Sequence, residues 1–159
     1  MKQIIAIFFA TLLLALPVGG MAASTDDHSS HGAQSMGHGG MMMGGGMVML
    51  EEKTEDGVRG MVHLNDTSEA MAKMGMKENR HFMVMFTDVA AGTPVAEGTV
   101  ALKITDPSGK ESEPLALVPM DGMFGADIAL TEKGAYRFTV GTKLADGRKR
   151  QFEFAYTLE

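Results

Sequence analysis

The chain has 159 residues, of which 14 are Lys or Arg and 20 are Asp or Glu, so its formal net charge is −6. This acidic balance argues against nucleic acid or anionic lipid as a partner, because both are bound through excess positive charge. The chain has no cysteine. It therefore cannot use a lipoprotein anchor, disulfides, thiolate metal ligands or a copper centre of the His/Cys/Met type, and its stability must come from packing.

The N-terminus predicts a secretory signal. Lys2 precedes an apolar run from Ile4 to Leu16, which is followed by Pro17 and by small residues around Ala22. This is the order of regions in a cleaved signal, so residues 1–22 are expected to be removed and the mature protein is expected to be periplasmic or otherwise exported. The run is short for a bilayer crossing and no second one follows, which predicts no membrane span after cleavage. An uncleaved anchor is the alternative.

Residues 23–46 predict a disordered arm rich in Met, His and Gly. The segment has no aromatic residue and cannot bury enough surface to offset chain entropy. Its metal-binding side chains, with those directly after it, are His28, His31, His38, Met36, Met41, Met42, Met43, Met47 and Met49. Glycines between them let two or three ligands converge on one ion. A low-complexity linker is the alternative.

Residues 47–159 show short alternating runs separated by turn residues, which predicts one antiparallel all-β domain. The expected strands cover residues 58–64, 80–88, 100–104, 115–117, 126–130, 136–140 and 152–158. Asp146-Gly147 predicts a hairpin turn, and Asp106 to Gly109 predicts a turn after an earlier strand. A total of about seven to eight strands is typical of an immunoglobulin-like or cupredoxin-like sandwich.

Methionine is the unusual feature of the composition. There are 16, and all but Met1 and Met21 follow the expected cleavage site, together with all five histidines. Thioether sulfur is a soft ligand that prefers Cu(I) and Ag(I), and imidazole binds Cu(I), Cu(II), Ni(II) and Zn(II). The mixture indicates Cu(I), with Ag(I) or Cu(II) as alternatives. Delivery of Ni or Zn through the arm histidines is a further alternative.

The expected strand at 80–88 places its ligands on one face. Because side chains alternate along a strand, the apolar residues at 82, 84 and 86 share the core side. The opposite side then carries His81, Met83 and Met85. Packing of the two methionines under a loop is the alternative, because methionine often fills irregular gaps.

The expected strand at 58–64 presents Met61 and His63 by the same alternation. If this strand is adjacent to the strand at 80–88, the two rows make a single patch of metal ligands. For the strand at 80–88, burial of both faces at the centre of a sandwich is a further alternative.

One short helix is expected, with Asp66 as its N-cap and Glu69 three residues on. It runs from Thr67 to about Met74, and Gly75 ends it. A third group of candidate ligands lies here: Met71, Met74 and Met76. The first two share a helix face, and the alternative is that the methionines seal the end of the sandwich.

Met120 and Met123 flank Asp121-Gly122 in a segment expected to be a loop, and they are candidate ligands if the fold brings them to His81. The sequence has no nucleophile motif, no phosphate-binding loop and no carboxylate pair near a histidine, so an enzyme is not expected. Asp88, Asp121 and Asp127 are interpreted as turn, edge or solvent residues.

The second half of the chain, from about His81 to Glu159, resembles exported YtkA-like and FixH-like sandwich domains. The similarity lies in a strand ending Phe-Thr-Asp, followed by Val-Ala-Leu-Lys-Ile-Thr-Asp-Pro-Ser-Gly, Gly-Met-Phe-Gly-Ala-Asp-Ile and Lys-Gly-Ala-Tyr-Arg-Phe-Thr-Val. It implies an immunoglobulin-like fold associated with copper handling or with assembly of membrane metalloproteins. Gly134-Ala-Tyr136 is similar to the tyrosine corner of such folds. His81-x-Met83 resembles the closing half of the motif of PCuAC-type periplasmic copper chaperones, whose opening His-Met pair is missing.

The main hypothesis is a periplasmic Cu(I)- or Ag(I)-binding protein or chaperone, in which the arm captures the ion and the body holds it. Its partner would be the ion and a periplasmic or membrane metalloprotein. The alternative is a non-enzymatic interaction domain that assists assembly of a membrane or redox complex, with its methionines contacting another protein.

Overall fold

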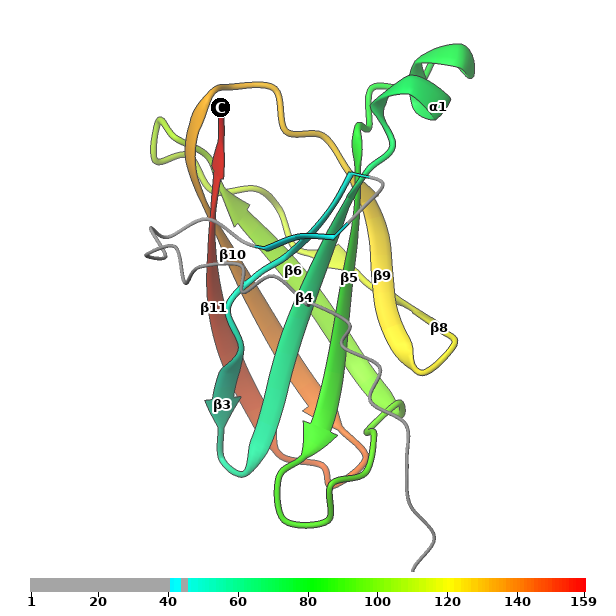
Figure 1. Cartoon of the computed structure of the whole chain (residues 1–159). Coiled ribbons are helices and arrows are strands. Elements are labelled where there is room, and N and C mark those ends of the chain that lie inside the picture. Colours follow the sequence, from blue (N-terminus) through cyan, green and yellow to red (C-terminus); the bar gives the residue numbers. More distant parts are fainter. Residues whose placement is uncertain (1–40, 44–45) are drawn as a thin grey trace, which may run out of the picture. The chain divides into compact units, whose positions relative to one another are not determined.

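The computed structural model describes residues 41–43 and 46–159, which form a β-sandwich of two antiparallel sheets (Figure 1). This confirms the predicted all-β fold. The described part contains one helix and eleven strands: β1 (Met41–Met43), β2 (Met47–Met49), β3 (Lys53–Glu55), β4 (Val58–Asp66), α1 (Ser68–Lys73), β5 (Arg80–Asp88), β6 (Gly98–Thr105), β7 (Leu115–Ala116), β8 (Val118–Met120), β9 (Met123–Ile128), β10 (Gly134–Leu144) and β11 (Lys149–Leu158). The number exceeds the predicted seven to eight because four further strands, β1, β2, β3 and β8, have only three residues each. Runs that short carry too little alternation to be recognised.

The two sheets differ in size. The first sheet has seven strands in the order β1-β2-β4-β5-β9-β8, with β3 also paired to β4. The second sheet has four strands in the order β11-β10-β6-β7. In the first sheet β5 therefore lies between β4 and β9, which places residues from three separate parts of the sequence side by side.

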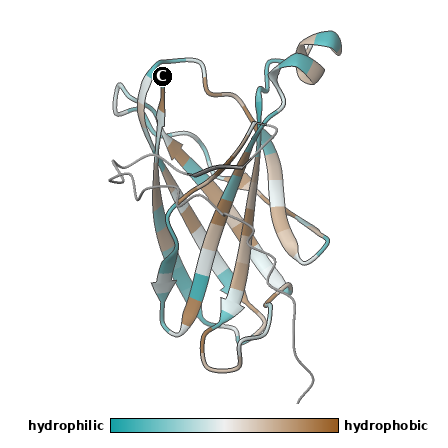
Figure 2. Cartoon of the chain, viewed as in Figure 1, coloured by the Kyte–Doolittle hydropathy of each residue, from teal (hydrophilic) through white to brown (hydrophobic). Residues whose placement is uncertain are grey.

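The core lies between the sheets and consists of the inward residues of the long strands. Figure 2 shows the alternation of hydrophobic and hydrophilic residues along these strands. Phe82 of the first sheet meets Phe138 of the second edge to face, with ring centroids 5.3 Å apart, and Phe86 meets Phe152 at the same separation. Such aromatic pairs add packing specificity to the burial of apolar surface that drives folding.

The C-terminal hairpin forms as the sequence predicts. β10 and β11 pair antiparallel around a turn in which Gly147 adopts a φ of +72°. The hydroxyl of Tyr136 donates to the carbonyl of Glu132 (2.8 Å) and accepts from its amide (2.9 Å). These bonds confirm the predicted tyrosine corner, which ties the start of β10 to the segment before it.

The short helix is also present, with ends close to those expected. Asp66 Oδ1 accepts hydrogen bonds from the amide and hydroxyl of Ser68, so it organises the turn before the helix, although Thr67 is the N-cap. At the other end Gly75 has a φ of +72°, and the amide of Met76 donates to the carbonyl of Met71 (3.0 Å). This Schellman-type turn ends the helix at the predicted glycine.

The segment around Met120 and Met123 is a hairpin, and the prediction of a loop was wrong. The two methionines pair with each other at the ends of β8 and β9. Asp121 and Gly122 both have positive φ, 44° and 81°, which is the geometry of a tight two-residue turn. An Asp-Gly pair is a strong signal for such a turn, but β8 is too short for its alternation to be read.

Residues 1–40 and 44–45 lie outside the described residues, and with them the predicted signal and the candidate ligands His28, His31 and His38. Residues 41–43 belong to the segment predicted as the arm, and the structure pairs them with β2. Within the described part of the chain, no helix is both long enough and apolar enough to span a membrane.

Candidate metal-binding face

The outward side of the first sheet brings the two predicted ligand rows together. β4 and β5 are antiparallel neighbours, and their register places Met61 opposite Met85 and His63 opposite Met83. Directly opposed residues point to the same side of a sheet. His81 follows in the same row, opposite Asn65.

Neighbouring strands extend this row of ligands on both sides. β2 places Met49 opposite His63 and Met47 opposite Asn65. On the other side, Phe124 of β9 is the partner of Val84 of β5. Met123 comes directly before Phe124, so it lies beside Met85 on the outward side of the sheet. We call this outward surface the methionine face, and its members are Met47, Met49, Met61, His63, His81, Met83, Met85, Met120 and Met123, all half-buried.

Half-burial separates these side chains from the core residues of the same strands. In β5 the inward Phe82, Val84 and Phe86 have 0% exposure, whereas His81 and Met83 retain access to solvent. The alternation predicted for this strand is therefore confirmed. The thioethers of the methionine face therefore lie outside the set of fully buried side chains that forms the core.

His63 is the most unusual member of the methionine face. Its Nε2 atom is buried and has no hydrogen-bond partner among the described residues. The residues directly across from it on both sides are Met49 and Met83, whose sulfur atoms are at best weak hydrogen-bond acceptors. A buried polar atom left without a partner is rare and disfavours folding by about 1–3 kcal/mol, so it calls for an explanation such as an ion.

His81 has a partner that fixes its orientation. Its Nδ1 lies 2.6 Å from Oδ1 of Asp127, which is its register partner on β9. An ionised carboxylate can only accept, so Nδ1 carries the proton, and in the neutral ring Nε2 then presents a lone pair. Metal-binding histidines are commonly oriented by such a carboxylate. Asp127 was interpreted from the sequence as a turn, edge or solvent residue, because no local pattern predicts that β9 pairs with β5.

Met120 reaches the same part of the methionine face. A Cβ placed on Gly125 of β9 would lie 3.2 Å from Nε2 of His81 and 3.2 Å from Sδ of Met120. Both atoms therefore overhang this one buried glycine. The condition set for Met120 as a candidate ligand, proximity to His81, is met.

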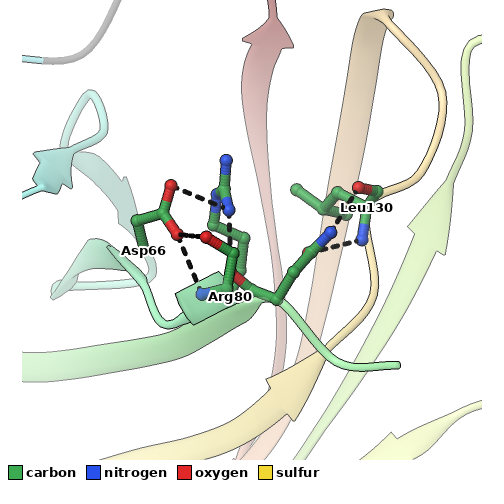
Figure 3. Close-up of polar contacts among 5 residues, drawn as sticks. Asp66, Arg80 and Leu130 are labelled. Atoms are coloured by element: carbon green, nitrogen blue, oxygen red, sulfur yellow. Dashed lines mark hydrogen bonds and ion pairs between the residues drawn. The ribbon is translucent and has the colours of Figure 1, made fainter. Parts of the chain in front are cut away.

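A polar network at the end of β4 and β5 holds this region in place (Figure 3). Asp66 Oδ2 pairs with Arg80 Nη1 at 3.0 Å, and the side chain of Asn79 makes hydrogen bonds to the carbonyl and amide of Leu130. Burial raises the pKa of Asp66, but hydrogen bonds from Ser68 and the charge of Arg80 outweigh it, so the pKa lies below its usual value. The carboxylate therefore stays ionised and anchors β5 directly before His81.

The three candidate ligands at the helix, Met71, Met74 and Met76, differ in their exposure to solvent. Met71 is 9% exposed, whereas Met74 is 62% and Met76 45% exposed. Met71 alone of the three is buried, so the helix face that the spacing predicted for Met71 and Met74 does not give them the same exposure. Among the described residues no three His, Asp or Glu side chains gather in a group that could hold a metal.

Comparison with known proteins gives the fold and no more. No protein-family model matches the chain, and no curated protein matches it. Among solved structures it is similar to a DUF4426 family protein from Pseudomonas aeruginosa, with a TM-score of 0.51 and 16% identity, over 68% of this chain and 96% of that chain. That likeness agrees with the β-sandwich, and the resemblance to YtkA-like and FixH-like domains stays a prediction.

Proposed function

We propose that this chain is an exported protein that binds Cu(I) or Ag(I) through thioether and imidazole ligands of the methionine face. The observation that carries the proposal is the buried Nε2 of His63, which has no hydrogen-bond partner in the described part of the chain and faces methionines on both neighbouring strands. A soft cation bonded to Nε2 would satisfy this atom. Thioethers suit such an ion because they are soft and uncharged.

The central ligand set consists of His63 with Met49 and Met83 directly across from it. Strands in a sheet lie about 4.8 Å apart, so three opposed side chains on neighbouring strands can lean toward a common point. Met61 lies two residues from His63 on the same side of β4 and is a further ligand. We call His63, Met49, Met83 and Met61 the His63 centre.

The role that fits this ligand set is capture and transfer of copper, without catalysis. The N-terminal signal pattern and the resemblance to YtkA-like and FixH-like domains favour a periplasmic location. His28, His31 and His38 would capture ions before they reach the body, and stepwise ligand replacement would pass them to an acceptor metalloprotein.

Anaerobic loading of the full chain with Cu(I), followed by native mass spectrometry and competition with a Cu(I) chelator, tests the proposal. The His63→Leu variant should bind one Cu(I) fewer than the unmodified chain. Asn65→Leu is the matched control, because it makes the same kind of change on the same side of β4 without removing a ligand. It should keep the full number of ions.

Two results would overturn the proposal. The unmodified chain retaining no Cu(I) or Ag(I) against the chelator would favour the interaction domain, in which the methionines contact protein. If His63→Leu bound as many Cu(I) ions as the unmodified chain, His63 would not be a ligand and the proposed His63 centre would be wrong.

A further inference from the structure

We infer that the methionine face carries a second soft-metal site, formed by Nε2 of His81 and Sδ of Met120 above Gly125, with Asp127 as its positioning residue. The inference rests on the proposed function for the identity of the ion, Cu(I) or Ag(I). Its ligands come from β5 and β8, and β9 between them supplies Gly125 and Asp127. We call this arrangement the His81 site.

Convergence of the two ligand atoms is the first argument for this site. Nε2 of His81 and Sδ of Met120 each lie 3.2 Å from the point where a Cβ of residue 125 would be. One imidazole nitrogen and one thioether sulfur around a shared point form a donor pair suited to a soft monovalent ion. The pairing needs three strands in register, so it is not an accident of neighbouring sequence positions.

Glycine at position 125 is the second argument. Its backbone is not in the left-handed region, so conformation does not require a glycine there. The reason for the missing side chain is space, because a Cβ would crowd His81 and Met120 at 3.2 Å and the carbonyl of Phe82 at 3.0 Å. Gly125 thus leaves room for the imidazole nitrogen and the thioether sulfur above this position of β9.

The hydrogen bond between His81 and Asp127 is the third argument. The 2.6 Å contact engages Nδ1 and leaves Nε2, which lies near the Cβ position of residue 125, for the ion. Loss of such a carboxylate partner commonly weakens metal binding by about 10- to 100-fold. Asp127 is 37% exposed, so it can perform this role without being part of the core.

The His81 site is separate from the His63 centre. His63 is on β4 and Gly125 is on β9, so β5 lies between them and the sites are about two strand spacings, or about 10 Å, apart. Met83 lies opposite both His63 and Gly125 and is the residue through which the two could communicate.

NMR spectroscopy of the full chain tests the inference, with Ag(I) as a probe that does not change oxidation state. Histidine rings labelled with ¹⁵N and methionine methyl groups labelled with ¹³C report each ligand separately. We expect Ag(I) to shift the Nε2 signal of His81 and the methyl signal of Met120 together. In His81→Gln the Met120 shift should vanish, while the signals of His63, Met49 and Met83 still respond.

The outcomes separate this inference from the proposed function. Response of the His63 centre without any response of Met120 would overturn the His81 site alone. Loss of both responses in His81→Gln would show a single joint site and would also overturn it. No response of any ligand on the methionine face to Ag(I) or Cu(I) would overturn the proposed function.

Filling the space above Gly125 gives an independent test. Gly125→Ala should lower the affinity of the His81 site for Ag(I) at least about 10-fold, because the added methyl group would displace His81 and Met120. Loss of a positioning group has an effect of this size on metal binding. Gly141→Ala is the matched control, because Gly141 also lies within a strand but a Cβ there meets nothing within 4 Å. Unchanged affinity in a folded Gly125→Ala variant would contradict the inference.

Asp127→Asn tests the positioning role even if Gly125→Ala does not fold. The amide can donate to Nδ1, so in the metal-free protein the ring should shift toward the form protonated at Nε2, which ¹⁵N chemical shifts detect. Ag(I) affinity at His81 should fall by about 10- to 100-fold, while the His63 signals stay unchanged. If neither the tautomer of His81 nor the Ag(I) affinity changed, Asp127 would not be a positioning residue of the site.

Discussion

The two sides of β5 show how one strand can serve packing and ligand binding independently. The inward Phe82 and Phe86 are fully buried and contact aromatic rings of the second sheet at 5.3 Å. The outward His81 and Met83 are half-buried and face thioethers, a carboxylate and a glycine. Because alternation separates the two sets, ligands can be changed on one side with little loss of folding energy on the other.

The greatest loss of stability should come from a change on the inward side of β5. Phe82→Ala should lower the free energy of unfolding by about 3–5 kcal/mol, because it removes a fully buried ring and leaves a cavity. Urea unfolding followed by circular dichroism measures the change. Met85→Ala on the outward side should have a clearly smaller effect, and an equal effect would mean that both sides of β5 are packed as core.

His63 should behave in the opposite way to Phe82. In the metal-free protein, His63→Leu should leave the free energy of unfolding unchanged or raise it by up to about 1–3 kcal/mol, because it removes a buried polar atom that has no partner in the described structure. Thermal unfolding with and without Cu(I) checks this. The unmodified chain should gain more stability from Cu(I) than the variant. A marked destabilisation of the metal-free variant would show that His63 is a packing residue.

Met83→Leu separates packing from ligand binding, because it keeps the volume of the side chain and removes only the sulfur. The free energy of unfolding should change by less than about 1.5 kcal/mol, whereas Cu(I) affinity measured by chelator competition should fall. Thr87→Leu, on the same side of β5 but without a lost ligand, is the control and should keep its affinity. Equal affinity in both variants would count against a ligand role for Met83.

The smallest expected effect lies on the second sheet, away from the methionine face. A hydrogen bond from Arg150 lowers the pKa of Asp146 from 3.8 to about 2. Since the folded-state pKa is the lower one, this carboxylate stabilises the fold above about pH 4, and the contribution is lost as the pH falls toward 2. Asp146→Asn should therefore be slightly less stable at pH 7 and equal to the unmodified chain below pH 2, as urea midpoints would show. Cu(I) binding should not change.

Long periodic segments were predictable from local patterns. Arg80 to Asp88 alternates over nine residues, and its bounds agree with the prediction. Asp146-Gly147 and Gly134-Ala-Tyr136 were recognisable because turn and corner residues act within a few positions. β8 was missed because three residues, one of them Pro119, carry no readable period.

Alternation and composition are local properties of the chain, so the sandwich class, the inward and outward sides of β4 and β5 and the abundance of soft side chains could be predicted from the sequence. Which strands are neighbours became known from the folded chain. The fold places Asp127 against His81, Met120 above Gly125, and Met49 and Met83 opposite His63 on the two neighbouring strands. Strand order and register arise from packing between distant segments, and no local pattern encodes them.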